Sequence, residues 1–102
     1  MTTLGAVVRK VRAKNAGPFW VTIDIFCDDP AVFAHVCQHL PNSMVAERFA
    51  LPPNEVRRFE IDSLNVLKFS LPRPATQGSR FDRDMHGAQW AIPLAELAIP
   101  EL

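Results

Sequence analysis

Apolar and polar residues alternate in three stretches of the chain, a pattern that predicts half-buried β-strands. The first stretch, residues 19–26, is rich in β-branched and aromatic residues, and its apolar face carries Phe19, Val21, Ile23 and Ile25. The stretches 56–62 and 66–71 alternate in the same way on either side of a short turn, which predicts a paired second set of strands. Their apolar faces carry Phe59, Ile61, Leu67, Phe69 and Leu71.

Helical periodicity lies between these strands. Asp29 is expected to cap a helix that begins at Pro30, because aspartate is a favoured cap and proline suits the first helical position. An apolar stripe at helical spacing follows and stops before Pro41: Val32, Phe33, Val36, Cys37 and Leu40. Asn42 or Ser43 is expected to cap a second helix, which the next pair of prolines ends and which turns Val45 and Phe49 inward.

Residues 4–12 fit two patterns. Leu4, Val7, Val8 and Val11 have the spacing of one helix face. Their β-branched content and the turn that follows at 13–18 instead favour a strand that forms a hairpin with residues 19–26. We favour the strand, and the helix remains the alternative.

These elements predict an α+β fold, a two-layer ferredoxin-like sandwich with a mostly antiparallel sheet that two helices cover on one face. The 102 residues are expected to form a single domain, 1–102. The uncovered face of the sheet would present Trp20, Phe26 and Val66 among the polar side chains of Thr22, Asp24 and Lys68. Large apolar residues on an open face mark a contact surface, so we expect an oligomer or a partner protein there.

Composition narrows the function classes. Eleven Lys and Arg balance eleven Asp and Glu, which argues against nucleic acid as the main partner. No stretch approaches the length of a transmembrane segment, and the first ten residues do not resemble a secretion signal. Cys27 and Cys37 lack metal or redox spacing and fit two reduced thiols in a cytoplasmic protein.

The two polar, breaker-rich stretches of the chain hold the candidate binding residues. The first, residues 13–19, and the position before it offer Arg12, Lys14, Asn15 and Gly17, whose backbone amides and cations suit a carboxylate or phosphate. The alternative is a plain hairpin turn with solvated cations. The second stretch, residues 72–89, is eighteen residues long and offers Arg73, Ser79, Asp82, Asp84 and Gln89.

The sequence gives little support for a metal-binding site. Asp82, Asp84 and His86 alternate in a way that suits a metal, but arginines between them can neutralise the aspartates instead. His35 and His39 are four residues apart on the polar side of a helix, with no third ligand nearby in sequence, so surface histidines are favoured. We expect no metal and no cofactor.

Five motifs in order resemble the small bacterial and fungal family called domain of unknown function 4387. They are KNAGPF at 14–19, TxDI at 22–25, DDP at 28–30, LPRP at 71–74 and GSxxDxDxxGAQ at 78–89. That family is often encoded beside, or fused to, a large protein of the acyclic terpene utilisation A type, which ends in a similar small ferredoxin-fold domain. An aromatic residue is common in the family where this chain has His86, which makes a catalytic role for that histidine less favoured.

The resemblance implies a small accessory subunit of a larger catabolic enzyme of hydratase or lyase type, acting on acyclic or branched organic acids or their thioesters. In this hypothesis the open sheet face docks on the acyclic terpene utilisation A-like protein. Lys14 and Arg73 hold a substrate oxygen, three polar side chains orient it, and Asp82 or Asp84 accepts a proton. The alternative is a stand-alone homo-oligomeric module that binds a small anionic metabolite.

Overall fold

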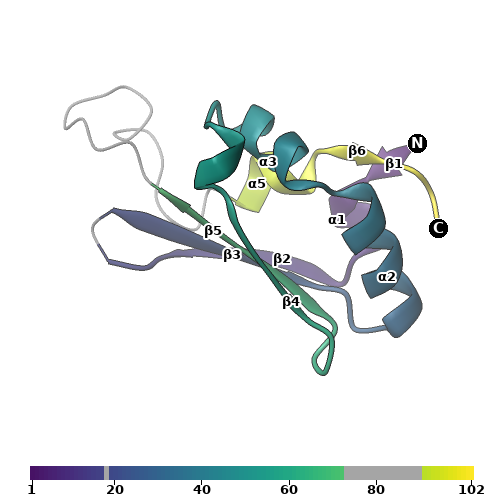
Figure 1. Ribbon diagram of the computed structural model, residues 1–102. Helices are drawn as coiled ribbons and strands as arrows, with labels where there is room; N and C mark the ends of the chain where they lie inside the picture. Colours follow the sequence, from purple (N-terminus) through teal and green to yellow (C-terminus); the bar gives the residue numbers. More distant parts are fainter. Residues whose placement is uncertain (18, 73–90) are drawn as a thin grey trace.

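A computed structural model describes residues 1–17, 19–72 and 91–102. Helices and strands alternate in blocks along the chain (Figure 1). In chain order the described elements are β1 (Thr2–Thr3), α1 (Leu4–Val7), β2 (Lys10–Asn15), β3 (Trp20–Phe26), α2 (Pro30–His39), α3 (Asn42–Arg48), the 3-10 turn η1 (Pro53–Glu55), β4 (Arg57–Ile61), β5 (Val66–Pro72), α5 (Ala91–Ala95) and β6 (Ala98–Ile99).

The main sheet has four strands in the order β2-β3-β5-β4, and every neighbouring pair is antiparallel. The described helices lie together on one side of this sheet, and no described helix or strand covers its other side (Figure 1). This arrangement confirms the predicted α+β two-layer sandwich of ferredoxin-like type. A second, two-stranded sheet pairs β1 with β6 and lies in the layer of the helices.

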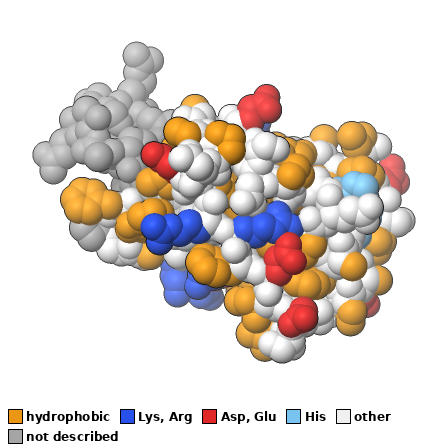
Figure 2. Space-filling model, viewed as in Figure 1, with side chains coloured by type: hydrophobic (Ala, Val, Ile, Leu, Met, Phe, Trp, Pro, Cys, Tyr) orange, Lys and Arg blue, Asp and Glu red, His pale blue; other side chains and the backbone are white. Residues whose placement is uncertain are grey.

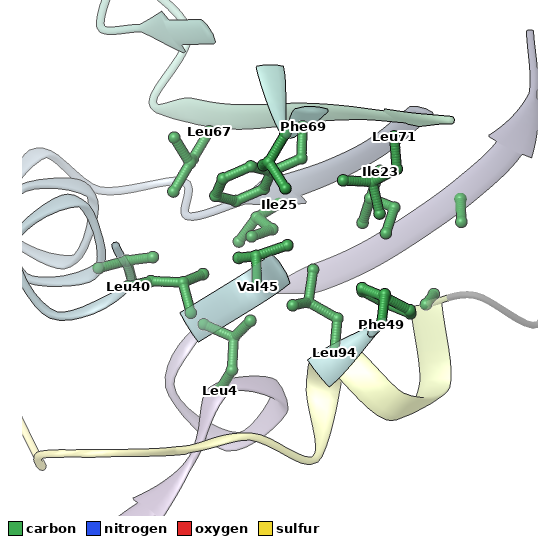
Figure 3. Close-up of a cluster of buried hydrophobic side chains, with 14 of the residues drawn as sticks. Leu4, Ile23, Ile25, Leu40, Val45, Phe49, Leu67, Phe69, Leu71 and Leu94 are labelled. Atoms are coloured by element: carbon green, nitrogen blue, oxygen red, sulfur yellow. The ribbon is translucent and has the colours of Figure 1, made fainter. Parts of the chain in front are cut away.

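The core lies between the sheet and the helices. The inward side chains of β3 and β5 are fully buried, as their alternation predicts: Val21, Ile23, Ile25, Leu67, Phe69 and Leu71. They face side chains from α2, α3, α1 and α5 (Figure 3). Burial of this apolar surface is the main contribution that holds the two layers together.

Local chemistry fixes the start of α2 as expected. The Asp29 carboxylate accepts from the backbone amide of Ala31 at 2.7 Å, and Pro30 is the first helical residue. The prediction for α3 is wrong in its cap, because Pro41 occupies that position and no side chain caps the helix. The adjoining turn replaces the cap: the carbonyl of Pro41 accepts from the amides of Met44 and Val45.

The first segment combines both of its predicted alternatives. Leu4–Val7 forms the short helix α1, so a strand over all of residues 4–12 is wrong. The strand β2 begins only at Lys10 and continues to Asn15, into the stretch expected to be a loop. The division follows packing: Leu4 is buried between the layers, whereas Val11 and Ala13 lie on the inner side of the sheet.

The face assignment of β4 is the opposite of the one expected from its apolar residues. Arg58 pairs in register with the buried Phe69, so Arg58 lies on the helix-facing side. Phe59 pairs with Lys68 and lies on the open side, where 48% of it is exposed. Phe19, expected in the core, precedes β3 and is 59% exposed. An edge strand and a hairpin end bury little area, so the core does not dictate their polarity.

Candidate functional site

The open face of the main sheet, below called the open face, collects side chains from all four strands. The register places them in cross-strand rows, because directly paired residues of an antiparallel sheet point to the same side. Its members are Lys10, Arg12 and Lys14 of β2, Trp20, Thr22, Asp24 and Phe26 of β3, Val66, Lys68, Ser70 and Pro72 of β5, and Arg57, Phe59 and Ile61 of β4.

Charge is strongly uneven between this face and the rest of the described chain. The open face carries five cations and one carboxylate, Asp24, although the whole sequence is neutral. Figure 2 views the sheet from its edge and shows Lys and Arg side chains over the sheet layer, with Asp and Glu side chains near some of them. Within the described ranges these five cations form no ion pair, whereas Arg9, Arg48 and Arg58 each pair with a carboxylate. The face therefore has unbalanced positive charge that favours an anionic ligand or an acidic surface.

Aromatic and aliphatic groups lie among these cations. The Arg57 guanidinium lies over the Trp20 ring, 4.6 Å from its centroid, a cation–π contact that orients the arginine. At the other end of the face, Phe26, Val66 and Ile61 form one cross-strand apolar row. Val66 lies between the other two in this row and is only 7% exposed. The predicted contact residues Trp20, Phe26 and Val66 thus do share the open face, and their role in an interface stays a prediction.

One cross-strand row is wholly polar. Lys14 pairs with Thr22, Thr22 with Ser70, and Ser70 with Arg57, so two hydroxyls lie between two cations. Thr22 is 9% exposed, and its Oγ1 has no hydrogen-bond partner among the described residues. Buried hydroxyls in proteins usually have a partner, so this one marks the row as unusual.

The first predicted loop is therefore a different structure from the one expected. Arg12 and Lys14 extend from strand β2 onto the open face, and Asn15 is the last residue of that strand. Gly17 has a φ of +81°, and the amide of Ala16 donates to the carbonyl of Trp20 at 2.8 Å, which closes a hairpin turn. The register places Arg12 beside Asp24 and Lys14 beside Thr22. The binding of an anion by these residues stays a prediction.

The second predicted loop lies outside the described residues. Arg73, Ser79, Asp82, Asp84, His86 and Gln89 all belong to it. The predictions made for those residues remain predictions.

The histidine pair of α2 contacts the C-terminal segment. The rings of His35 and His39 are 4.6 Å apart between centroids, and His35 Nε2 lies 2.6 Å from the carbonyl oxygen of Pro100. Both side chains are half-buried, so they are not the solvated surface histidines that were expected. Across residues 1–17, 19–72 and 91–102, no cluster of three or more His, Cys, Asp or Glu side chains is placed to hold a metal ion.

Both cysteines are free thiols, Cys27 buried and Cys37 half-buried. Burial, with a smaller contribution from the nearby Cys37, raises the pKa of Cys27 to about 11. Burial also raises the pKa of Cys37, and Glu60 adds to the effect. Neither thiol is therefore suited to act as a nucleophile near neutral pH.

These raised pKa values predict a loss of stability in alkali. The folded chain holds the Cys27 proton more tightly than the unfolded chain, whose thiol has a pKa of about 9.0. The stabilising contribution is complete below that value and is lost as the pH rises toward 11. Urea titrations across this range should show a falling midpoint, and the fall should be smaller in Cys27→Ala. An equal fall in both proteins would contradict the assignment.

A shallow hollow of about 280 Å³ lies in the helix layer, lined by Met44, Glu47, Arg48 and Leu97. Arg48 closes one side through a hydrogen bond to the Pro93 carbonyl at 3.0 Å and an ion pair with Glu96 at 3.8 Å. It contains no residue of the open face. The hollow is small, and its arginine is already paired with a carboxylate. It is therefore a weaker candidate site than the open face.

Five residues of the open face were not predicted to bind a ligand, although the sequence pattern placed Thr22 and Lys68 on that face: Lys10, Arg57, Lys68, Thr22 and Ser70. Their common signal is alternation, since each lies two or four positions from another member on its own strand. The register between strands, which brings them together, is a tertiary property.

No described helix is long and apolar enough to cross a bilayer. Neither the curated proteins nor the solved structures contain a significant match to this chain. Among known protein families, residues 4–98 match the one described as Domain of unknown function (DUF4387). That match spans nearly the whole sequence and includes every element from α1 to the start of β6. The chain therefore belongs to this family of domains of unknown function.

Proposed function

We propose that this protein is a small accessory subunit that docks through its open face on a larger catabolic protein of the acyclic terpene utilisation A type. The observation that supports docking is the collection of five described, unpaired cations with large apolar side chains on one uncovered sheet face. The complementary surface is acidic with an apolar centre. Such complementarity gives specificity and speeds association.

Apolar residues would provide most of the binding energy. Phe59 is an exposed aromatic next to Lys68, and Trp20 is half-buried under the Arg57 guanidinium. Buried Trp, Tyr and Arg side chains are the usual centres of binding energy in protein interfaces, with a polar rim around them. The open face presents two of these residue types side by side.

A symmetric homodimer through this face is less favourable. A two-fold contact places the same patch on both partners, so five cations would meet five cations with one carboxylate on each side. The homo-oligomeric form of the alternative hypothesis therefore needs another surface. Its other component, the binding of a small anionic metabolite, retains support from the five cations that have no ion pair among the described residues.

In the docked complex the proposed chemistry is that of a hydratase or lyase on acyclic or branched organic acids or their thioesters. Lys14 extends from the open face and would hold a substrate carboxylate or thioester oxygen at the boundary of the two proteins. The subunit would thus complete an active site, and the partner protein would provide most of the reacting groups.

Replacing Phe59 with glutamate tests the docking proposal. We expect the substitution to weaken binding to the co-expressed acyclic terpene utilisation A-like protein at least tenfold, because it removes an exposed aromatic and adds a carboxylate facing an acidic surface. Affinity can be measured by surface plasmon resonance after size-exclusion chromatography with light scattering establishes the stoichiometry. Wild-type binding should also weaken as salt is raised.

Ile92→Glu is the matched control, since Ile92 is comparably exposed, at 58%, but belongs to α5 in the other layer. It should bind like the wild type. Absence of a wild-type complex, or equal loss in the two variants, would refute docking through the open face.

A further inference from the structure

We infer that the polar row of the open face, Lys14, Thr22, Ser70 and Arg57, is a binding site for a small dianionic ligand, such as a dicarboxylate or a phosphate. The row crosses all four strands, so a single chain supplies every group. It shares only Lys14 with the anion site expected from sequence, and the other three residues are new. The inference concerns the isolated chain and does not depend on docking.

The hydroxyl of Thr22 is the strongest indication of a ligand. Threonine occupies the middle of β3, and its Oγ1 is buried without a partner among the described residues. Burying a hydroxyl without a hydrogen-bond partner destabilises the folded state. Valine has nearly the same shape and carries no such cost, so packing alone does not account for threonine at this position. An oxyanion at the row would accept the hydroxyl proton and remove the cost.

The two cations at the ends of the row provide charge. Arg57 and Lys14 belong to the outer strands, three strand spacings or about 14 Å apart along the row. Both have long side chains that can lean inward over Thr22 and Ser70. The cation–π contact with Trp20 limits the rotamers of Arg57, so less entropy is lost when its planar fork binds two oxygens.

The charge of the row indicates the class of ligand. Two cations and two hydroxyl donors match two negative charges and four or more acceptor oxygens. Asp24, the carboxylate of the open face, belongs to the next row, where Arg12 and Lys68 are its cross-strand neighbours. Those two cations offset its repulsion of an anion at the polar row.

Titration of the purified chain with inorganic phosphate and with succinate tests the site. Amide chemical shifts recorded at constant ionic strength, with sodium chloride as the reference salt, give the dissociation constant for each probe. We expect saturable shifts in β3 and β5 around Thr22 and Ser70 for at least one probe. Arg57→Met and Lys14→Met should each raise the dissociation constant at least tenfold.

Lys10→Met is the matched control, because it removes the same charge from the same strand and face four residues from Lys14. It should change the dissociation constant less than twofold. Thr22→Val should leave the melting temperature without anion unchanged or higher, yet abolish most of the rise that the anion causes. Together these results distinguish specific binding at the polar row from a general attraction of anions to a basic surface.

Two results would overturn the inference. One is the lack of a saturable response to either probe in the wild-type chain. The other is a loss of affinity in Lys10→Met as large as that in Arg57→Met. Because the measurement uses the chain alone, a negative result leaves the docking proposal untouched, and failure of docking leaves this site intact.

Discussion

Replacing Arg58 with methionine is expected to lower the free energy of unfolding by about 3 kcal/mol. The Arg58 guanidinium donates to the backbone carbonyl of Leu40 at 2.6 Å and to that of Cys37 at 2.7 Å. It also forms an ion pair with Glu60 at 2.7 Å. Methionine keeps the apolar stem but removes all of these donors.

The magnitude follows from where the bonds are made. Helix α2 ends at His39, so Cys37 belongs to its last turn and Leu40 is its C-cap. The carbonyls at these positions lack partners within the helix. Hydrogen bonds from a charged donor contribute roughly 1.5–3 kcal/mol each, and burying a carbonyl without a partner adds a cost. Partial exposure to solvent reduces the total, since water can replace some of the lost donors. The guanidinium thus ties edge strand β4 to the end of α2.

Urea unfolding of three variants checks this expectation. Arg58→Lys keeps the charge but cannot direct one planar fork at two carbonyls, so it should recover only part of the loss. Arg57→Met, the adjacent residue on the open face, should stay within about 0.5 kcal/mol of the wild type. If the free energy of unfolding of Arg58→Met also stayed within that margin, water would replace the guanidinium without loss of stability, which would contradict the expectation.

Arg58 also shows where the sequence pattern stops being informative. Alternation correctly predicts that β4 has two different faces, but the core usually decides which one is covered. In β3 and β5 every inward residue is a large apolar one, and the prediction for those strands is confirmed. In the edge strand β4 the apolar Phe59 points outward, because two carbonyls at the end of α2 require the donors of Arg58.

The sequence predicted local structure correctly where the chemistry of single residues determines it. Asp29 and Pro30 mark the start of α2 through their own hydrogen-bonding and backbone geometry. The helix α1 is four residues long, too short for its periodicity to be distinguished from that of a strand. Gly17 adopts a left-handed conformation, which glycine reaches readily and which suits a tight hairpin turn.

The candidate site was only partly predictable for a different reason. Zero net charge hides the separation of cations onto one face, because composition carries no positions. The polar row further requires three strand registers, Lys14 with Thr22, Thr22 with Ser70 and Ser70 with Arg57. A shift of one residue in any of them would turn a member to the helix layer. Sequence alone supplied Lys14 as a candidate binding residue. It also supplied the open-face location of six residues: Trp20, Thr22, Asp24, Phe26, Val66 and Lys68.

The C-terminal segment was not assigned any element from sequence, although it completes the core. Prolines interrupt it, and its apolar residues form runs too short to show a period. In the structure α5 packs against α1, and β6 pairs with β1. The amide of Leu4 donates to the carbonyl of Leu97 at 2.8 Å, which joins the two ends of the described chain.

Leu94→Ala is therefore expected to lower the free energy of unfolding by about 2–5 kcal/mol, the range for a leucine removed from a packed core. Leu94 is fully buried and faces the sheet beside Val45 and Phe49 (Figure 3). Ile92→Ala, two residues earlier and largely exposed, should cost less than about 0.5 kcal/mol. Equal, small losses in both variants would mean that the segment contributes little to the core. A large loss confined to Leu94 would show that the C-terminal segment contributes substantially to the core between the sheet and the helix layer, where this leucine is fully buried.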